Sequence, residues 1–350
     1  MEKIKLLGST PEQLKEIAIS LKLPAFTGGQ IADWIYKKKV KSIEQMTNLS
    51  KIARERLSKD YIVGIDDFTD VQISNDGTKK YLFPTHTGSF IEAVMIPDTN
   101  RYTLCVSSQA GCKMACEFCM TGRGGFKGNL STAEIISQFL AVEESDLLTN
   151  TVFMGMGEPL DNLDNVLKAI EILTAPWGFA WSPKRITLSS IGVNWSKDKE
   201  RGNPLKVFLD STKAHLAISL HNPFPDERIQ LMPMEKSFPI EETIDLIKQY
   251  DFSGQRRVSF EYIMFNRLND SKVHADAIIR MLRGLECRVN LIRFHSIEGS
   301  SLMSSPLPIM EIFRDRLNSS GITATIRASR GEDILAACGM LSGKKENDIK

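Results

Sequence analysis

The sequence predicts an α/β protein, built as a partial (βα)6 barrel with a small helical domain before it. From residue 102 on, six short runs of branched and apolar residues alternate with helical stretches, whereas residues 1–60 are mostly helical in pattern. Repeated strand–helix units cross over right-handed, which closes a parallel sheet into a complete or partial barrel. Unusual polar residues also follow most of the strands, where the active site of such a barrel lies.

The N-terminal helices begin at a capping box. Thr10 stands before Pro11 and three residues before Gln13, a pattern typical of a helix N-terminus. Two further helices are predicted at 28–38 and 50–59.

The pattern changes from helices to strands after the turn-like segment Ser74-Asn75-Asp76-Gly77. Residues 79–85 and 90–96 predict a hairpin through Thr87 and Gly88. We therefore expect the chain to divide into three parts: a helical domain with linker strands over 1–80, a barrel domain over 81–343 and a tail over 344–350.

The barrel is predicted from its strands and from the helices between them. The strands are expected at Tyr102–Ser107, Thr151–Met154, Arg185–Ser189, His215–Leu220, Val258–Met264 and Val289–Phe294. Amphipathic helices are expected at 131–145, 161–173, 240–250 and 272–284, the first opened by a second capping box at Ser131 and Glu134.

Composition excludes several classes of protein. With 350 residues, 42% of them hydrophobic and 25% charged, the chain can bury a large core. It contains no apolar run of the roughly 20 residues needed to cross a bilayer, and its start lacks the apolar core of a signal peptide. Six cysteines are too few for a disulfide-stapled secreted fold. We expect a cytoplasmic protein with no membrane association.

The charge distribution does not decide whether the N-terminal part of the chain binds nucleic acid. The chain has 44 basic and 43 acidic residues, but residues 1–60 contain 12 Lys or Arg and only 7 Asp or Glu. The basic run Lys37-Lys38-Lys39 lies beside Trp34 and Tyr36, so it could contact a phosphate backbone while the rings stack on bases. The alternative is a solvated helix end whose aromatic residues turn into the core.

Three cysteines with the spacing C-x3-C-x2-C indicate a metal centre. Cys112, Cys116 and Cys119 can hold a 4Fe-4S cluster while one iron stays open for a cofactor. A structural zinc site is the alternative, and it would need a fourth ligand, for which Cys105 is the candidate nearby in sequence. Disulfides are disfavoured because the three cysteines are too close together to staple a fold.

Polar residues stand at the ends of five predicted strands. The cysteine triplet follows the first strand, and Gly155-Met156-Gly157-Glu158-Pro159 follows the second. The third, fourth and sixth strands end at Ser189-Ser190, Ser219-Leu220-His221 and His295. Each of these residues alone is typical of a strand end or a helix cap, but their shared location predicts one site at the barrel mouth.

The triplet, with Phe118 before its last cysteine, resembles the radical S-adenosylmethionine (SAM) superfamily. The flanking segments resemble the RlmN/Cfr family of RNA methyltransferases more closely. These segments are Thr103–Cys112, Phe153–Leu160, Ala217–His221 and Ala336–Gly339. Within the family, Ile96–Arg101 and Gly125–Leu130 resemble RlmN more than Cfr.

This resemblance implies methylation of adenine C2 at adenosine 2503 of 23S rRNA and adenosine 37 of tRNA. It implies a ping-pong reaction that uses two SAM molecules, a 4Fe-4S cluster and an electron donor such as flavodoxin or ferredoxin, in a monomer whose N-terminal helices bind RNA. Two alternatives remain. One is methylation at C8, as in Cfr, and the other is a non-catalytic RNA-binding protein stabilised by zinc.

The resemblance also implies which residues bind the cofactors. The cluster ligands would be Cys112, Cys116 and Cys119. The SAM-binding residues would be Gly157, Glu158, Ser189, Ser219, Leu220, His221 and His295. His295 departs from the pattern of bacterial RlmN, which has asparagine there, and so adds a titratable group.

Three more residues would carry the methyl transfer. By resemblance, Cys338 takes a methyl group from one SAM, and the methylated cysteine is then activated by the second SAM and bonds to adenine C2. Cys105 releases the product by forming a transient disulfide with Cys338, and Glu92 accepts the C2 proton. Without the resemblance, these residues read as a strand cysteine, a small turn residue and an outward strand carboxylate, and Cys287 reads as packing.

Overall fold

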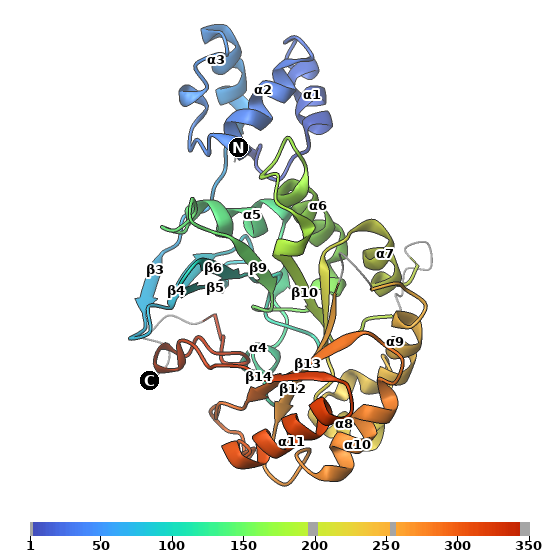
Figure 1. Ribbon diagram of the computed structural model, residues 1–350. Helices are drawn as coiled ribbons and strands as arrows, with labels where there is room; N and C mark the ends of the chain where they lie inside the picture. Colours follow the sequence, from blue (N-terminus) through green and yellow to red (C-terminus); the bar gives the residue numbers. More distant parts are fainter. Residues whose placement is uncertain (1–2, 195–201, 253–256, 344–350) are drawn as a thin grey trace.

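A ten-stranded sheet forms the centre of this computed structural model, which describes residues 3–194, 202–252 and 257–343 (Figure 1). Its strand order is β14-β13-β12-β11-β10-β9-β6-β5-β4-β3. In the described part of the chain, the seven strands of this sheet from β14 to β6 run parallel to one another. They are β6 Arg101–Cys105, β9 Asn150–Phe153, β10 Ile186–Ser190, β11 His215–Ser219, β12 Val258–Met264, β13 Cys287–Arg293 and β14 Thr323–Ile326.

The predicted partial barrel is confirmed, and β14 extends it by one strand. The six expected strands correspond to β6 and β9–β13, with ends that differ by a few residues. β14 and the helix before it, α11 Leu307–Ser319, were not predicted. β14 has only four residues, of which two are exposed, so its apolar pattern is too short to indicate a strand.

Antiparallel strands continue the sheet beyond β6. The predicted hairpin is confirmed as β4 Lys79–Pro84 and β5 Phe90–Asp98, which pair antiparallel. β5 pairs with β6, and the unpredicted edge strand β3 Asp70–Ile73 pairs with β4. A short separate pair, β7 Gln109–Ala110 with β8 Gly128–Asn129, brackets the segment that contains the cysteine triplet.

Helices pack around the outside of the parallel strands (Figure 1). The four predicted barrel helices are confirmed as α5, α6, α9 and α10, while α7 and α8 are additional. Several begin with a proline in the first turn, which suits a position whose amide has no helical partner. The helices are α4 Met120–Arg123, α5 Thr132–Ala141, α6 Leu163–Thr174, α7 Pro204–Ser211, α8 Pro225–Leu231, α9 Ile240–Ile247 and α10 Lys272–Met281.

The N-terminal segment is helical, as predicted. It consists of α1 Pro11–Ser20, α2 Thr27–Ala32 with a π-helical turn after it, and α3 Lys51–Asp60. The first capping box is confirmed, because the Thr10 hydroxyl accepts from the Gln13 amide and the Gln13 side chain accepts from the Thr10 amide. Strands β1 Ile4–Lys5 and β2 Tyr61–Ile62 pair parallel and join the two ends of the segment.

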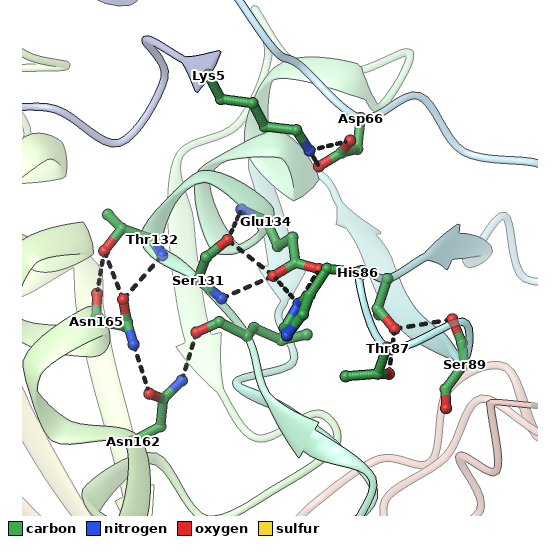
Figure 2. A network of polar contacts seen from close by, with 12 residues as sticks. Lys5, Asp66, His86, Thr87, Ser89, Ser131, Thr132, Glu134, Asn162 and Asn165 are labelled. Atoms are coloured by element: carbon green, nitrogen blue, oxygen red, sulfur yellow. Dashed lines mark hydrogen bonds and ion pairs between the residues drawn. The ribbon is translucent and has the colours of Figure 1, made fainter. Parts of the chain in front are cut away.

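Specific contacts attach the N-terminal helices to the barrel domain. The Tyr36 ring lies 5.5 Å from the Trp177 ring, between centroids. Lys39 Nζ lies 2.6 Å from Asp146 Oδ1. Lys5 Nζ donates to both oxygens of Asp66, just before β3 (Figure 2). One continuous hydrophobic core therefore includes residues of both parts.

The basic run is largely engaged with acidic groups. Lys37 and Lys38 pair with Asp33, and Lys38 Nζ lies 3.5 Å from the centroid of the Trp34 ring. Tyr36 is buried in the core. This arrangement agrees with the helix-end alternative for Tyr36, whereas Trp34 remains half-buried.

Two predictions from the sequence concern the C-terminal tail and membrane-spanning helices. The predicted tail, 344–350, lies outside the described residues. In the part of the chain that the structure describes, no helix is both long enough and apolar enough to cross a bilayer.

Candidate active site

A cavity of about 490 Å³ lies beside the carboxyl ends of the parallel strands. Residues from β6, β9, β10, β11, β12 and β13 contribute to its wall, as a barrel active site requires. The predicted residues that line it are Cys105, Cys112, Cys116, Cys119, Gly157, Glu158, Ser189, Ser219, His221, His295 and Cys338. The structure therefore brings most of the predicted site together, whereas Leu220 and Glu92 are not part of the wall.

The cysteine triplet lies on a compact loop between β7 and α4. Gly111 begins this loop with a positive φ of 73°, and a Cβ there would stand 1.7 Å from the carbonyl oxygen of Gly125. Burial raises the pKa of Cys112 to about 12, and burial together with Cys119 and Cys112 raises the pKa of Cys116 well above its usual value. Thiolates at these positions therefore need a cationic partner, as a metal centre would provide.

The donor set of the triplet matches a 4Fe-4S cluster. A structural zinc ion takes four thiolate or imidazole ligands around one centre. A 4Fe-4S cube with one open iron takes three thiolates, one on each of the other irons. Cys112, Cys116 and Cys119 supply three free thiols from one loop in the cavity wall, so they fit the cluster.

Figure 2 shows a polar network that includes Ser131, Glu134, Asn162 and Asn165, and this network bonds to residues on both sides of the cysteine loop. The Asn162 side chain donates to the carbonyl oxygens of Ser108 and Leu130, both at 2.8 Å. Asn165 in turn donates to Asn162 Oδ1 at 2.9 Å. The second predicted capping box is part of the same network, since Glu134 Oε2 accepts from the Ser131 amide at 2.7 Å. Helices α5 and α6 thus fix both ends of the segment that bears the triplet.

Glu158 is buried at the end of the loop after β9. Its Oε1 accepts from the Leu160 amide and its Oε2 from the Ile191 amide, both at 3.0 Å. Burial raises the pKa of Glu158 to about 7, against the effect of these hydrogen bonds. The preceding Gly157 has a φ of 99°, and a Cβ there would meet the Gln109 backbone at 2.8 Å. Glycine is therefore required for Glu158 to reach the cavity.

Ser219, Leu220 and His221 form the end of β11. The Leu220 side chain is fully buried in the core, and its amide and carbonyl groups are bonded to Glu261 and Arg228. His221 has a φ of 52°, and its Nδ1 accepts from the Ile263 amide at 3.0 Å. Burial lowers the pKa of His221 to about 3, so the ring is neutral and its proton is on Nε2. His221 is therefore a hydrogen-bond donor in the cavity wall.

Cys105 and Cys338 line the same cavity although they come from β6 and from the C-terminal segment. Both are free thiols, as are all six cysteines. Burial raises the pKa of Cys105, and nearby Cys338 raises it further. Cys338 is exposed to the cavity, but burial by the protein around the cavity still raises its pKa. Arg327 lowers the pKa of both thiols. A cation is thus near both sulfurs.

The C-terminal segment that bears Cys338 packs directly on the cysteine loop. The Met120 amide donates to the Gly339 carbonyl at 2.8 Å, and the Thr121 hydroxyl donates to the Leu341 carbonyl at 2.7 Å. Farther back in this segment, Ser329 Oγ lies 2.9 Å from His295 Nε2. The cysteine loop, the end of β13 and Cys338 therefore share one wall.

Glu92 lies beneath this segment and does not reach the cavity. Its Oε2 accepts from the amides of Ser342 and Gly343 at 2.7 and 2.9 Å. Its Oε1 lies 3.2 Å from Lys80 Nζ, and both side chains are buried. The expectation of an outward strand carboxylate is thus wrong, because the C-terminal segment covers this position.

Comparison with known proteins places this architecture in a family. Residues 106–277 match the Radical SAM superfamily, and residues 4–63 match the ribosomal RNA large subunit methyltransferase N-terminal domain. A Porphyromonas gingivalis protein named a probable dual-specificity RNA methyltransferase RlmN is 56% identical over 344 residues, which is 98% of this chain and 95% of that protein. The chain belongs to the RlmN family.

Two more distant relatives agree with this assignment. The dual-specificity RNA methyltransferase RlmN of Syntrophus aciditrophicus is 38% identical, over 98% of each chain. The crystal structure of a radical SAM methyltransferase from Sphaerobacter thermophilus superposes with a TM-score of 0.89 at 34% identity, covering 97% of this chain and all of that one. The resemblance to the RlmN family and the radical SAM fold are thereby confirmed, and the family implies SAM and a 4Fe-4S cluster as cofactors.

Sequence reasoning missed a positioning residue at this RlmN-family site. Arg228 on α8 is almost completely buried and donates to the carbonyl oxygens of Ser219 and Leu220 at 2.8 and 2.9 Å. Its guanidinium also pairs with buried Glu235. No helix was predicted at α8, and its sequence Pro-Asp-Glu-Arg-Ile-Gln-Leu has no local signal of this contact.

Sequence reasoning also missed Glu261, a buried glutamate in the wall of the cavity. It lies in β12, within the apolar run Val-Ser-Phe-Glu-Tyr-Ile-Met. A carboxylate inside a buried strand is uncommon without a partner, so its position in this run was a usable signal.

Proposed function

We propose that the protein is a radical SAM enzyme that methylates C2 of adenine in RNA, at adenosine 2503 of 23S rRNA and adenosine 37 of tRNA. One observation carries this proposal. Cys105 and Cys338 line the same cavity as the cysteine triplet and Glu158, although they are far apart in sequence. A site for SAM alone would need neither of these two thiols. The names of the RlmN relatives support RNA as the substrate.

The residues of the cavity divide into two binding groups. Cys112, Cys116 and Cys119 are the proposed cluster ligands, and when bound the cluster and SAM supply one-electron chemistry. The ionised form of Glu158 accepts from the ammonium group of SAM. The proposed contacts to the rest of SAM are Gly157, Ser189, Ser219, the backbone of Leu220, His221 and His295.

Cys338 is the proposed carrier of the transferred carbon. Its thiol must lose a proton before the sulfur can attack the methyl group of SAM, a step in which S-adenosylhomocysteine leaves, and the raised pKa opposes this loss. Arg327 favours the thiolate. After the carbon has bonded to adenine C2, the carbon bridges the RNA and the Cys338 sulfur.

Cys105 is the proposed resolving thiol. Its sulfur bonds to the Cys338 sulfur, the carbon–sulfur bond to the RNA breaks, and the electron pair of that bond leaves with the nucleoside, which takes up a proton to give the methyl group. Glu92 is the proposed acceptor of the C2 proton. Because its Oε2 is bound by the amides of Ser342 and Gly343, this role requires the C-terminal segment to shift away from β5.

The test is the nucleoside content of RNA from a strain that lacks this gene. We expect 2-methyladenosine to disappear from 23S rRNA and tRNA, to return with the wild-type protein, and to stay absent with Cys338→Ala. Cys287→Ala is the matched control, because Cys287 is half-buried on β13 and does not line the cavity. Unchanged methylation in the deletion strain would refute the proposal, and 8-methyladenosine would replace it with the Cfr-like reaction.

A further inference from the structure

Glu261 has a buried carboxylate oxygen without a partner. The residue is only 4% exposed, and it lines the cavity. Its Oε1 accepts from Ser259 Oγ at 2.9 Å and from Asn290 Nδ2 at 2.7 Å. Its Oε2 has no hydrogen bond with any group that the structure describes. Because an unpaired buried carboxylate oxygen is costly, this atom calls for a donor from a bound molecule.

A row of polar side chains holds Glu261 in this orientation. Ser219, Glu261, Asn290 and Thr325 occupy matching positions on the neighbouring strands β11, β12, β13 and β14. The Thr325 hydroxyl donates to Asn290 Oδ1 at 3.2 Å, which directs the Asn290 amino group toward Glu261. Since Asn290 of this row and Ser259 both donate to Oε1, Oε2 is the oxygen that remains for a ligand.

The backbone of Glu261 belongs to the same part of the site. Its carbonyl oxygen accepts from the Leu220 amide at 3.0 Å. The residue is therefore joined to the end of β11 through its main chain and stands level with Ser219. A molecule that contacts Ser219 in the cavity lies within reach of the next strand.

We propose that Glu261 is a further SAM-binding residue, whose Oε2 accepts a hydrogen bond from a ribose hydroxyl of SAM. This inference rests on the proposed function. The triplet and Glu158 lie at the ends of β6 and β9 and take the amino-acid end of SAM, so the nucleoside extends across β10 and β11 toward β12. A carboxylate repels the methionine carboxylate and cannot bond to the ring nitrogens of adenine, which are acceptors. The donors on the nucleoside are the ribose hydroxyls and the adenine amino group, and the hydroxyls lie nearer to the amino-acid end of SAM. Carboxylates recognise ribose hydroxyls elsewhere.

The substitution Glu261→Gln inverts the hydrogen bonding without changing the shape. Ser259 and Asn290 both donate, so the glutamine carbonyl stays on their side and its amino group faces the cavity. An acceptor thereby becomes a donor at the same place. We expect the Kd of SAM to rise about 10- to 100-fold. Glu144→Gln is the matched control, because Glu144 is a buried glutamate bonded to Tyr81 outside the cavity.

Equilibrium dialysis of the anaerobically reconstituted full-length protein tests the contact, with SAM and its 2′-deoxy and 3′-deoxy analogues as probes. Wild type should bind one of the two deoxy analogues about 10- to 100-fold more weakly than it binds SAM. Glu261→Gln should bind that analogue and SAM with the same affinity. The wild-type comparison stands even if the variant fails to fold. Equal iron and sulfide content of the three proteins verifies that each is intact.

Three results would overturn the inference. The first is an unchanged affinity for SAM in Glu261→Gln. The second is that the deoxy analogue binds more weakly than SAM by the same factor in the variant and in wild type. The third is weaker RNA binding with unchanged SAM binding, which would assign Oε2 to the target adenosine. A wild-type protein with an intact cluster but no affinity for SAM would instead refute the proposed function, so the two failures are distinguishable.

Discussion

The two thiols Cys105 and Cys338 impose an order on the proposed chemistry. Each thiol has a raised pKa, and Cys338 itself contributes to the shift of Cys105. Two neighbouring thiolates are therefore unfavourable at the same time. A methylated Cys338 cannot ionise, so it no longer opposes the thiolate of Cys105 once the carbon has been loaded. This sequence suits a resolving thiol, which must act last.

Glu158 gives a prediction about pH and stability. Its folded-state pKa of about 7 exceeds the ordinary value of 4.5, so the unfolded chain releases this proton first as the pH rises. The contribution of Glu158 to the free energy of unfolding is therefore complete below about pH 4.5. It is lost as the pH rises to about 7, and the loss is roughly 3 kcal/mol in total. Urea unfolding of the cluster-free protein measures this loss between pH 4.5 and pH 8.

Glu158→Gln is the corresponding variant, because the amide cannot titrate. We expect a smaller decline in the free energy of unfolding over the same pH range, whatever the constant cost of the substitution. Equal declines in variant and wild type would contradict the raised pKa of this carboxyl.

At the scale of elements, α8 acts as a brace for the end of β11. Arg228 fixes two successive carbonyl oxygens there, and Glu235 in turn accepts from the Ile240 amide at the start of α9. The chain from α8 to α9 thus sets the position of Ser219 and Leu220. With Ser219 and Leu220 as proposed SAM contacts, this brace would couple stability to SAM binding.

Removing the Arg228 side chain leaves the buried carboxylate of Glu235 without its cationic partner. We expect Arg228→Met to lower the free energy of unfolding by about 3 to 5 kcal/mol, and Arg228→Met with Glu235→Gln to recover part of it. Arg314→Met is the control, because Arg314 pairs with Asp315 at the surface and its loss should leave stability nearly unchanged. Urea unfolding checks all three. A small loss in the single variant would contradict a bracing role.

At the scale of the whole molecule, the N-terminal helices are held against the barrel by a few contacts, among them the Tyr36–Trp177 ring pair. If these helices position RNA, as the family resemblance implies, Trp177→Ala should weaken RNA binding several-fold while leaving the affinity for SAM unchanged. Filter binding with a tRNA and dialysis with SAM measure the two quantities. Ile312→Ala, an exposed apolar residue on α11, is the control. Parallel losses of both affinities would point to general destabilisation instead.

The local pattern of the sequence was enough to predict most of this architecture. Six apolar runs located the parallel strands, and the spacing of Cys112, Cys116 and Cys119 located the cluster loop. The contacts of Glu92, Arg228 and Glu261 were not predictable, because they depend on strand register and on segments far away in the chain. The pairing of Cys105 with Cys338 came from family resemblance, since no periodicity relates two such distant residues.

The central claim is that Cys338 carries the carbon and Cys105 releases the product. Mass spectrometry of Cys105→Ala protein, after reaction with SAM, a reductant and a tRNA substrate, tests it most directly. We expect a covalent protein–RNA adduct joined through one carbon at Cys338, which is absent when Cys338 is also replaced by alanine. Continued release of methylated RNA by Cys105→Ala, with no adduct, would contradict the account.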